Sequence, residues 1–282
     1  MNSHNGRTYL PNTLIEIIKP RLPCAPLRHV LFDFDGTISL IREGWQQSMI
    51  SMMVEFLLAT PEAEAEAAIS QAIADWVFHS TGRPTIDQMT YLATEVVRRG
   101  GPLQDPHVYK CLYLDQLLAR VNRRMTSLKR GQIEPTELTV PGALDLLAAL
   151  HDRGVTCHLA SGTEREAVVE EAEALGVSRY FEHRIYGPQD GGPAFSKKMV
   201  IHQILHDYDL SGCELVSIGD GKVEIEYTVE AGSIGIGVAS NEAERHGINE
   251  AKRQQLIQAG ADIIVPDFCE GETLLNYLTG NC

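Results

Sequence analysis

Several features are scarce or absent in this 282-residue sequence, and each argues against a class of protein. Positive charge is scarce. The 24 Lys and Arg residues stand against 38 Asp and Glu, and the formal net charge of −14 argues against a nucleic-acid partner, because phosphate backbones bind basic surfaces. No run of about 18 apolar residues occurs, so we expect no membrane-spanning helix. The N-terminal MNSHNGRTYLPNTLIEIIKPRLP lacks an apolar core and a cleavage-site pattern, so it is not expected to be a secretion signal.

Cysteine is also sparse, and its spacing is uninformative. None of the six cysteines forms a CxxC pair, so the sequence gives no support to a zinc site or a disulfide framework. We therefore expect reduced thiols in a cytoplasmic protein. The six are Cys24, Cys111, Cys157, Cys213, Cys269 and Cys282.

The composition is that of a globular protein, and the predicted type of secondary structure changes along the chain. Hydrophobic residues make up 44% and charged residues 22%, which fits a folded protein with a substantial core. A buried strand is expected at 29–34, followed by a turn. Helix-like segments then occupy 41–59, 62–80, 85–101 and 105–131, the third beginning at the capping residue Thr85.

After this helical stretch, strands and helices alternate to the end of the sequence. Strands are expected at 155–160, 213–219, 233–238 and 261–266, with helices between them. This alternation predicts an α/β fold with a doubly wound, Rossmann-like parallel sheet, interrupted by an all-helical insertion. The predicted organisation is a first core part at 1–38 that includes an N-terminal extension, a helical domain at 39–138, and a second core part at 139–282.

Polar side chains stand where the predicted strands end. Asp33 and Asp35 follow the first strand, Ser161 follows the second, and Asp220 follows the third. The carboxyl ends of parallel strands meet at one edge of such a sheet, so these side chains should converge there. Like charges brought together need a counter-ion, and grouped carboxylates suit a hard divalent cation such as Mg²⁺.

Four segments that carry these residues resemble a known family. The segments DFDGT, LASGT, the lysines of FSKKMVI, and IGDGKVE look like the four motifs of the haloacid dehalogenase superfamily, and they occur in that family's order. The helical insertion after the first motif looks like the family's C1 cap. The resemblance implies phosphoryl transfer with Mg²⁺, because the first motif has a second aspartate.

The first motif then implies specific roles. Asp33 is implied to be the nucleophile and a metal ligand, and Asp35 the general acid and base, with its main-chain carbonyl also on the metal. Gly36 is expected to let the chain turn and to bring backbone N–H groups near phosphate, while Thr37 orients the loop.

The second motif implies a phosphate contact. Ser161 is expected to donate a hydrogen bond to a phosphoryl oxygen, helped by the Gly162 amide and by the N-terminus of the helix that follows. A simple helix-capping role for Ser161 is the alternative.

Two adjacent lysines compete for the third motif. Helical residues advance by about 100° each, and the apolar stripe of this helix then centres near the direction of Lys197, with Lys198 about 90° away. We therefore predict that Lys197 balances the charge of the nucleophile, and Lys198 is the alternative. The stripe consists of Val200, Ile201, Ile204 and Leu205.

In the fourth motif Asp220 is expected to bind the metal directly. Glu224 stands where the family usually has an aspartate, so direct metal binding by Glu224 is an open question. Arg42, just after the first motif, offers local positive charge for an anionic substrate, or else is a solvated helix residue.

These features predict a Mg²⁺-dependent phosphatase that acts on a small phosphate ester such as a sugar phosphate, without nucleic-acid or membrane partners. A phosphomutase that uses the same nucleophile is the alternative. A non-catalytic relative is disfavoured, because such a protein should have lost acids at the catalytic positions, whereas Asp33, Asp35 and Asp220 are all present.

Overall fold

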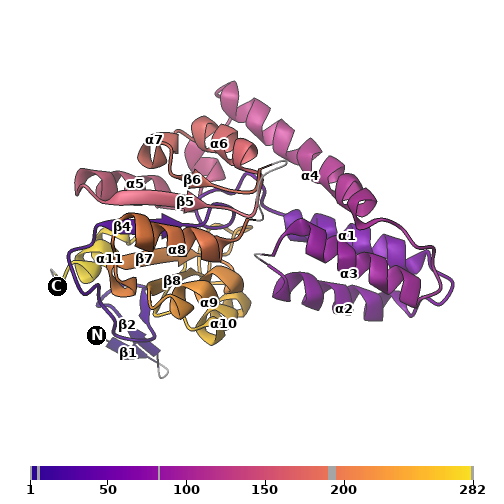
Figure 1. The fold of residues 1–282 in the computed structure, drawn as a ribbon, viewed down its shortest axis with the longest axis horizontal. Helices are drawn as coiled ribbons and strands as arrows, with labels where there is room; N and C mark the ends of the chain where they lie inside the picture. Colours follow the sequence, from indigo (N-terminus) through magenta and orange to yellow (C-terminus); the bar gives the residue numbers. More distant parts are fainter. Residues whose placement is uncertain (1, 5–6, 82, 190–194, 281–282) are drawn as a thin grey trace. The chain divides into compact units, whose positions relative to one another are not determined.

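A computed structural model describes residues 2–4, 7–81, 83–189 and 195–280 of the chain (Figure 1). The chain divides into two compact units, a sheet unit made of residues 1–41 and 127–282, and a helical unit, Arg42–Thr126. The helical unit is thus an insertion, as predicted, although its bounds are narrower than the 39–138 expected from the sequence.

The strands of the sheet unit form one nine-stranded sheet in the order β1-β2-β3-β9-β8-β7-β4-β5-β6. Their bounds are β1 Asn2–His4, β2 Arg7–Tyr9, β3 Glu16–Ile17, β4 His29–Phe32, β5 Thr156–Ala160, β6 Ile185–Tyr186, β7 Leu215–Gly219, β8 Ile234–Val238 and β9 Ile263–Val265. The α-helices of this unit are α5 Ala143–Asp152, α6 Arg165–Ala174, α7 Ser178–Phe181, α8 Lys197–Asp207, α9 Lys222–Glu230, α10 Glu250–Ala259 and α11 Gly271–Leu278. Short 3₁₀ turns occupy Pro135–Leu138 and Gly212–Glu214.

Strands β4 to β9 are parallel, and this confirms the doubly wound α/β fold predicted from the sequence. The chain runs from β4 outward through β5 to β6, then returns to the other side of β4 to add β7, β8 and β9. Right-handed crossovers place α8, α9 and α10 on one face of the sheet, and α5 and α7 on the other (Figure 1). The strand order therefore reverses at β4, where ligands bind in folds of this type.

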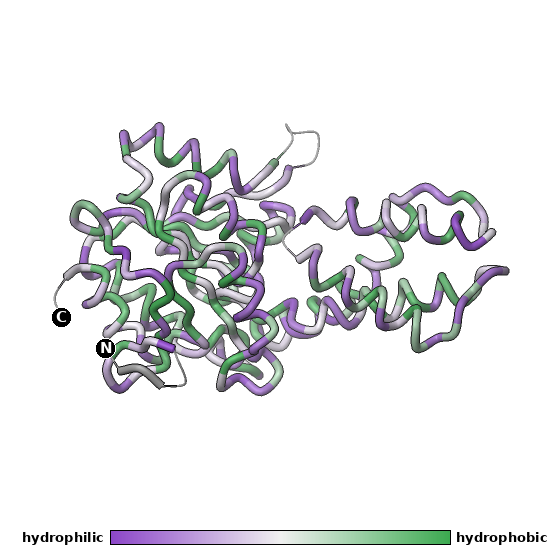
Figure 2. Tube along the Cα trace, turned by 90° about the horizontal axis from the view of Figure 1, so that it is seen from below, coloured by the Kyte–Doolittle hydropathy of each residue, from purple (hydrophilic) through white to green (hydrophobic). Residues whose placement is uncertain are grey.

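The core lies between the sheet and these helices. Strands β4, β7, β8 and β9 are buried along their whole length, as expected for parallel strands covered on both faces. Figure 2 shows hydrophobic segments passing through the interior of this unit. The apolar stripe of α8 packs here, with Val200, Ile201 and Ile204 buried against Leu31 and Leu215.

The N-terminal extension adds three short antiparallel strands to the sheet, so the complete sheet is mixed. Strand β3 pairs with β9, and the buried Glu16 at its start accepts two hydrogen bonds from Arg253 of α10, each of 2.6 Å. These strands have two or three residues each, which is too short for a period-two pattern to be recognised in sequence.

A disulfide joins Cys24 of this extension to Cys213, just before β7. The prediction of six reduced thiols is therefore wrong for Cys24 and Cys213. The cysteines thus no longer support the prediction of a cytoplasmic protein. Among the described residues, Cys157 is a buried free thiol and Cys111 and Cys269 are exposed ones; Cys282 lies outside the described residues.

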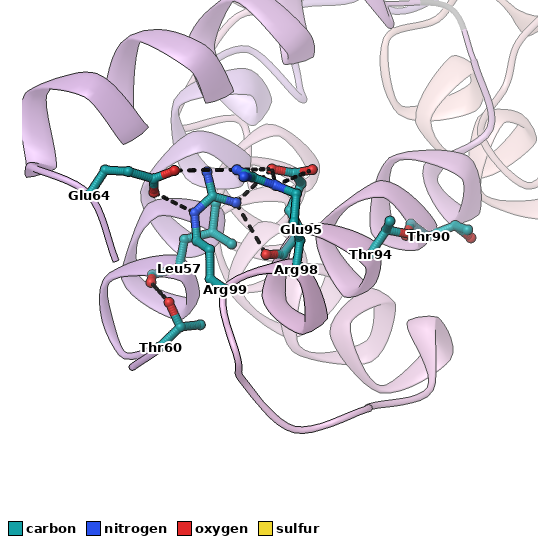
Figure 3. Close-up of polar contacts among 8 residues, drawn as sticks. All are labelled: Leu57, Thr60, Glu64, Thr90, Thr94, Glu95, Arg98 and Arg99. Atoms are coloured by element: carbon teal, nitrogen blue, oxygen red, sulfur yellow. Dashed lines mark hydrogen bonds and ion pairs between the residues drawn. The ribbon is translucent and has the colours of Figure 1, made fainter. Parts of the chain in front are cut away.

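The helical unit contains α1 Trp45–Leu58, α2 Glu66–His79, α3 Thr85–Arg98 and most of α4, Pro106–Lys129. Thr85 is the first residue of α3 and follows the N-cap Pro84, so its predicted capping role is wrong. At the other end of α3, Arg98 and Arg99 form ion pairs with Glu64 and Glu95 that link α3 to the segment before α2 (Figure 3). None of the helices in the described residues is long and apolar enough to span a bilayer.

Candidate active site

Three neighbouring strands of the sheet unit deliver polar residues to one edge. Asp33 follows β4, Ser161 follows β5 and Asp220 follows β7. In the parallel register, Phe32 lies opposite both Leu159 and Ile218, so the three strands end at nearly the same level. The acids predicted from the ends of the strands are therefore brought together.

The Asp33 side chain is only 9% exposed and lies against Lys197. Its Oδ1 atom lies 2.7 Å from the Lys197 Nζ and accepts a hydrogen bond of 2.8 Å from the Phe34 N–H. Burial raises the pKa of Asp33 well above its usual range, and the charge of Lys197 opposes that shift. Burial alone would lower the pKa of Lys197, but the charges of Asp33 and Glu224 outweigh burial and raise it.

The two candidate lysines lie in different surroundings. Lys197, the first residue of α8, is buried and points its ammonium group at Asp33 and, at 3.5 Å, at Glu224. Lys198 forms an ion pair at 2.5 Å with Glu230, and its side chain is 40% exposed. Of the two, only Lys197 lies beside Asp33.

Asp35 is held by two hydroxyl groups from the loop after β5. Its Oδ2 atom accepts hydrogen bonds from Ser161, at 3.2 Å, and from Thr163, at 3.0 Å. Ser161 also accepts a bond of 3.0 Å from the Thr163 N–H, and the N-cap of α6 is Glu164, so Ser161 does not cap that helix. Thr163 was not predicted as a site residue from the sequence, although it stands two residues after Ser161 in the same turn.

The turn after Asp35 depends on glycine. Gly36 has φ of +78°, and a Cβ atom at this position would lie 2.3 Å from the Asp220 Oδ2. The Gly36 N–H donates to the Ser39 carbonyl at 2.9 Å, so this amide has a partner within its own loop. Thr37 is fully buried, and its hydroxyl has no hydrogen-bond partner among the described residues. Gly162 is exposed.

Asp33, Asp220 and Glu224 form a group suited to a metal ion, with one carboxylate oxygen of each within 4.8 Å of the others. Grouped carboxylate oxygens of this kind could hold a single hard cation such as Mg²⁺, which takes oxygen ligands. Glu224 turns back along α9, where its Oε1 accepts the Gly221 N–H at 2.5 Å; its buried Oε2 accepts no hydrogen bond from any described residue. Burial raises the pKa of Asp220 to about 6, against the effect of Lys252 beside it.

One further predicted site residue, Arg42, belongs to the helical unit. Arg42 is the first residue of that unit and is buried, and its predicted contact with substrate stays a prediction. In the sheet unit, Lys252 was not predicted from the sequence as a site residue. Its ammonium group lies 2.7 Å from the Asp220 Oδ2.

Comparison with known proteins agrees with this fold and with the placement of its motifs. A family profile described as haloacid dehalogenase-like hydrolase matches residues 27–232. No curated protein matches the chain.

Solved structures with the same fold have low sequence identity to the chain. A predicted phosphoglycolate phosphatase from Haemophilus somnus 129PT is 15% identical, with 89% of this chain and 99% of that one covered and a TM-score of 0.59. A HAD family hydrolase from Deinococcus radiodurans R1, solved with bound phosphate and sodium, is 20% identical over 90% and 97%, with a TM-score of 0.56. A candidate β-phosphoglucomutase from Bacteroides vulgatus is 16% identical over 90% of each chain, with a TM-score of 0.58.

The profile covers most of the chain, from just before β4 to the end of α9, and so includes all four motifs and the inserted helical unit. The fold shared with these structures is the one predicted from the motifs and from the alternation of strands and helices. The family suggested by four short segments is therefore confirmed: this chain belongs to the haloacid dehalogenase-like hydrolases.

Proposed function

We propose that this hydrolase is a Mg²⁺-dependent phosphatase that acts on a small phosphate ester, such as a sugar phosphate, through an aspartyl-phosphate intermediate. One observation carries the proposal. The nearly buried carboxylate of Asp33 lies 2.7 Å from the Lys197 Nζ and shares a cluster of carboxylate oxygens with Asp220 and Glu224. A carboxylate placed between a fixed ammonium group and a cation site is suited to attack an anionic phosphoryl group.

In the first step, Asp33 acts as the nucleophile. Lys197 and the Phe34 N–H both contact Oδ1, which leaves Oδ2 to attack phosphorus. The bond from phosphorus to the ester oxygen breaks, and Asp35 donates a proton to the leaving alkoxide. Lys197 then balances the charge that collects on the phosphoryl oxygens.

In the second step, water cleaves the aspartyl-phosphate. Asp35, now a carboxylate, takes a proton from the water as the water attacks phosphorus, and the bond from phosphorus to Asp33 breaks to release phosphate. The Thr163 hydroxyl holds the Asp35 Oδ2 through both proton transfers. The Ser161 hydroxyl, whose single proton is donated to the Asp35 Oδ2 in this structure, turns to a phosphoryl oxygen when substrate binds. Ser161 and the Gly162 amide are the proposed contacts to the phosphoryl oxygens.

Asp33, Asp220, Glu224 and the Asp35 main-chain carbonyl are the proposed ligands for Mg²⁺. When bound, the ion supplies positive charge that offsets the repulsion between the carboxylates and the phosphate. Glu224 joins this set through Oε2, because Oε1 is already held by the Gly221 N–H. The longer side chain thus caps its own helix and still reaches the site.

The test is phosphate release from a panel of phosphate esters, with Mg²⁺ and then with EDTA. Asp33→Asn should abolish release, and the matched change Asp152→Asn, at an exposed position at the end of α5, should leave it intact. In Asp35→Asn, a substrate with a good leaving group should leave one phosphoryl group on the protein, detectable by mass spectrometry. Equal release by wild type and Asp33→Asn would refute the mechanism.

The same assay separates hydrolysis from a phosphomutase reaction, since one of the similar solved structures is a candidate β-phosphoglucomutase. A mutase given a sugar monophosphate and a bisphosphate activator would yield the isomeric sugar phosphate in place of free phosphate. Free phosphate as the only product supports the phosphatase.

A further inference from the structure

A buried lysine outside the four motifs contacts the proposed metal site. The Lys252 Nζ, from α10, lies 2.7 Å from the Asp220 Oδ2 and 2.5 Å from the Glu242 Oε1. The side chains of Lys252 and Asp220 are only 8% and 9% exposed. Both Lys252 and Glu242 lie beyond residue 232, where the match to the family profile ends.

The fold holds this lysine in place through the start of its helix. Asn249 caps α10, and its side chain accepts the N–H groups of Ala251 and Lys252, each at 3.1 Å. The Asn249 N–H in turn donates to the Ala239 carbonyl, just after β8, at 2.8 Å. Lys252 is therefore anchored, through one cap residue, to the edge of the sheet that carries the proposed active site.

Burying the Lys252 ammonium group costs free energy unless charged partners compensate for the lost water. A lysine taken out of water needs charged partners with good geometry, and surface lysines avoid this cost by remaining solvated. Lys198 illustrates the alternative, because it pairs with Glu230 on the exposed side of α8. Lys252 instead forms ion pairs with Asp220 and with Glu242, which lies in the loop after β8.

Asp220 is confined on one side by the same geometry. Its Oδ2 atom accepts a hydrogen bond from the Lys252 ammonium group and also lies against Gly36, where a Cβ atom would be only 2.3 Å away. One carboxylate oxygen is thus enclosed by protein, and Oδ1 is the oxygen left for a cation. A carboxylate held in this way has its orientation set before the cation binds, and supporting contacts of this kind tune metal ligands.

We infer that Lys252 is a positioning residue that fixes Asp220 for metal binding, with Glu242 holding the lysine in register. This inference rests on the proposed Mg²⁺ site. Two effects of removing the lysine oppose each other. Loss of a nearby positive charge favours a bound cation, whereas loss of the contact frees the Asp220 carboxylate to rotate. The enclosure of Oδ2 makes orientation the dominant effect, so affinity falls when Lys252 is lost.

The experiment measures metal binding without substrate. Free Mn²⁺ is counted by electron paramagnetic resonance during titration of the protein, and Mg²⁺ is added as a competitor. We expect Lys252→Met to weaken binding about 10- to 100-fold, the range usual for residues that orient metal ligands. Lys198→Met, the same chemical change at the exposed pair on α8, should bind Mn²⁺ like wild type.

The outcomes are distinct. Wild type should bind Mn²⁺ and Asp220→Asn should bind it poorly. If Lys252→Met then binds Mn²⁺ as tightly as wild type or more tightly, the role of Lys252 is overturned, whereas the proposed metal site stands. Absence of Mn²⁺ binding by wild type overturns both proposals. Circular dichroism checks the fold of each variant. Should Lys252→Met not fold, Lys252→Ala, which also removes the donor to Asp220, carries the test, and binding equal to wild type overturns the inference.

Discussion

Two buried histidines, His29 at the start of β4 and His158 in the middle of β5, should make the sheet unit sensitive to acid. The His29 Nδ1 lies 3.3 Å from the His158 Nε2, and the rings of Tyr186 and Tyr208 pack around them. Burial, together with the charges of His29 and Arg184, lowers the pKa of His158 to about 3. The Nδ1 atom of His158 has no hydrogen-bond partner among the described residues.

The direction and size of the effect follow from linkage. Unfolded His158 has a pKa of about 6.5, so between about pH 6.5 and 3 the unfolded chain carries a proton that the folded protein excludes. Stability therefore falls as the pH drops through this range, by about 1.4 kcal/mol per pH unit. At about pH 5 the loss from His158 alone is about 2 kcal/mol, a substantial part of the 5–15 kcal/mol typical of a folded domain. The pKa of His29 is lowered too, and it acts in the same direction.

Buried carboxylates oppose this effect in the metal-free protein. Because burial raises the pKa values of Asp33 and Asp220, their folded forms keep protons longer than their unfolded forms. For these groups stability falls as the pH rises, between about pH 4 and about 6 for Asp220. The wild-type profile therefore sums opposing contributions, and only comparison with a variant isolates the histidine.

The assay compares wild type with His158→Leu by urea unfolding, followed by circular dichroism at about pH 7.5 and about pH 5. The stability lost between these pH values should be about 2 kcal/mol smaller in the variant. Both tryptophans, Trp45 and Trp76, lie in the helical unit, so their fluorescence reports on that unit and not on the surroundings of His158. Equal losses in wild type and variant would refute the linkage argument.

Three further changes test the site and the fold. Gly36→Ala should lower phosphate release at least about tenfold, because the new methyl group would displace the carboxylate of Asp220, a proposed metal ligand. Gly131→Ala, also at positive φ but with open space around it, should cost only about 1 kcal/mol of stability. Lys197→Met should lower kcat/KM about 100- to 1,000-fold, and Lys198→Met should not; equal effects would remove the charge-balancing role. Cys24→Ser should lower the free energy of unfolding by about 2–4 kcal/mol, because the disulfide closes a long loop. Thiol titration in denaturant, before and after reduction, checks the pairing of Cys24 with Cys213. Wild type should gain two thiols on reduction and Cys24→Ser should gain none; a gain of two thiols in the variant would contradict the pairing.

The central sheet and its acids could be predicted from sequence because each depends on local pattern. Asp33, Ser161 and Asp220 each follow a short apolar run, and parallel strands bring the ends of such runs together whatever lies between them. The direction of Lys197 followed from the apolar stripe of its own helix.

What the sequence did not reveal depends on contacts between distant segments. Lys252 and Asp220 lie 32 residues apart in the chain, and Cys24 and Cys213 are separated by 189, so no periodicity links them. The final helix α11, Gly271–Leu278, is a different case, because its buried Leu274, Leu275 and Leu278 have helical spacing that the sequence analysis did not use.

The bond between Cys24 and Cys213 also sets how the protein would respond to force applied at its two ends. Tension would bypass every residue between these cysteines, including the whole helical unit, Asp33 and Lys197, because the covalent link carries the load across them. Asp220 and Lys252 lie outside the closed segment and would be drawn out. Pulling on oxidised protein would thus separate the two halves of the proposed cation site while the nucleophile stays with its lysine, and a reductant would restore extension along the full chain.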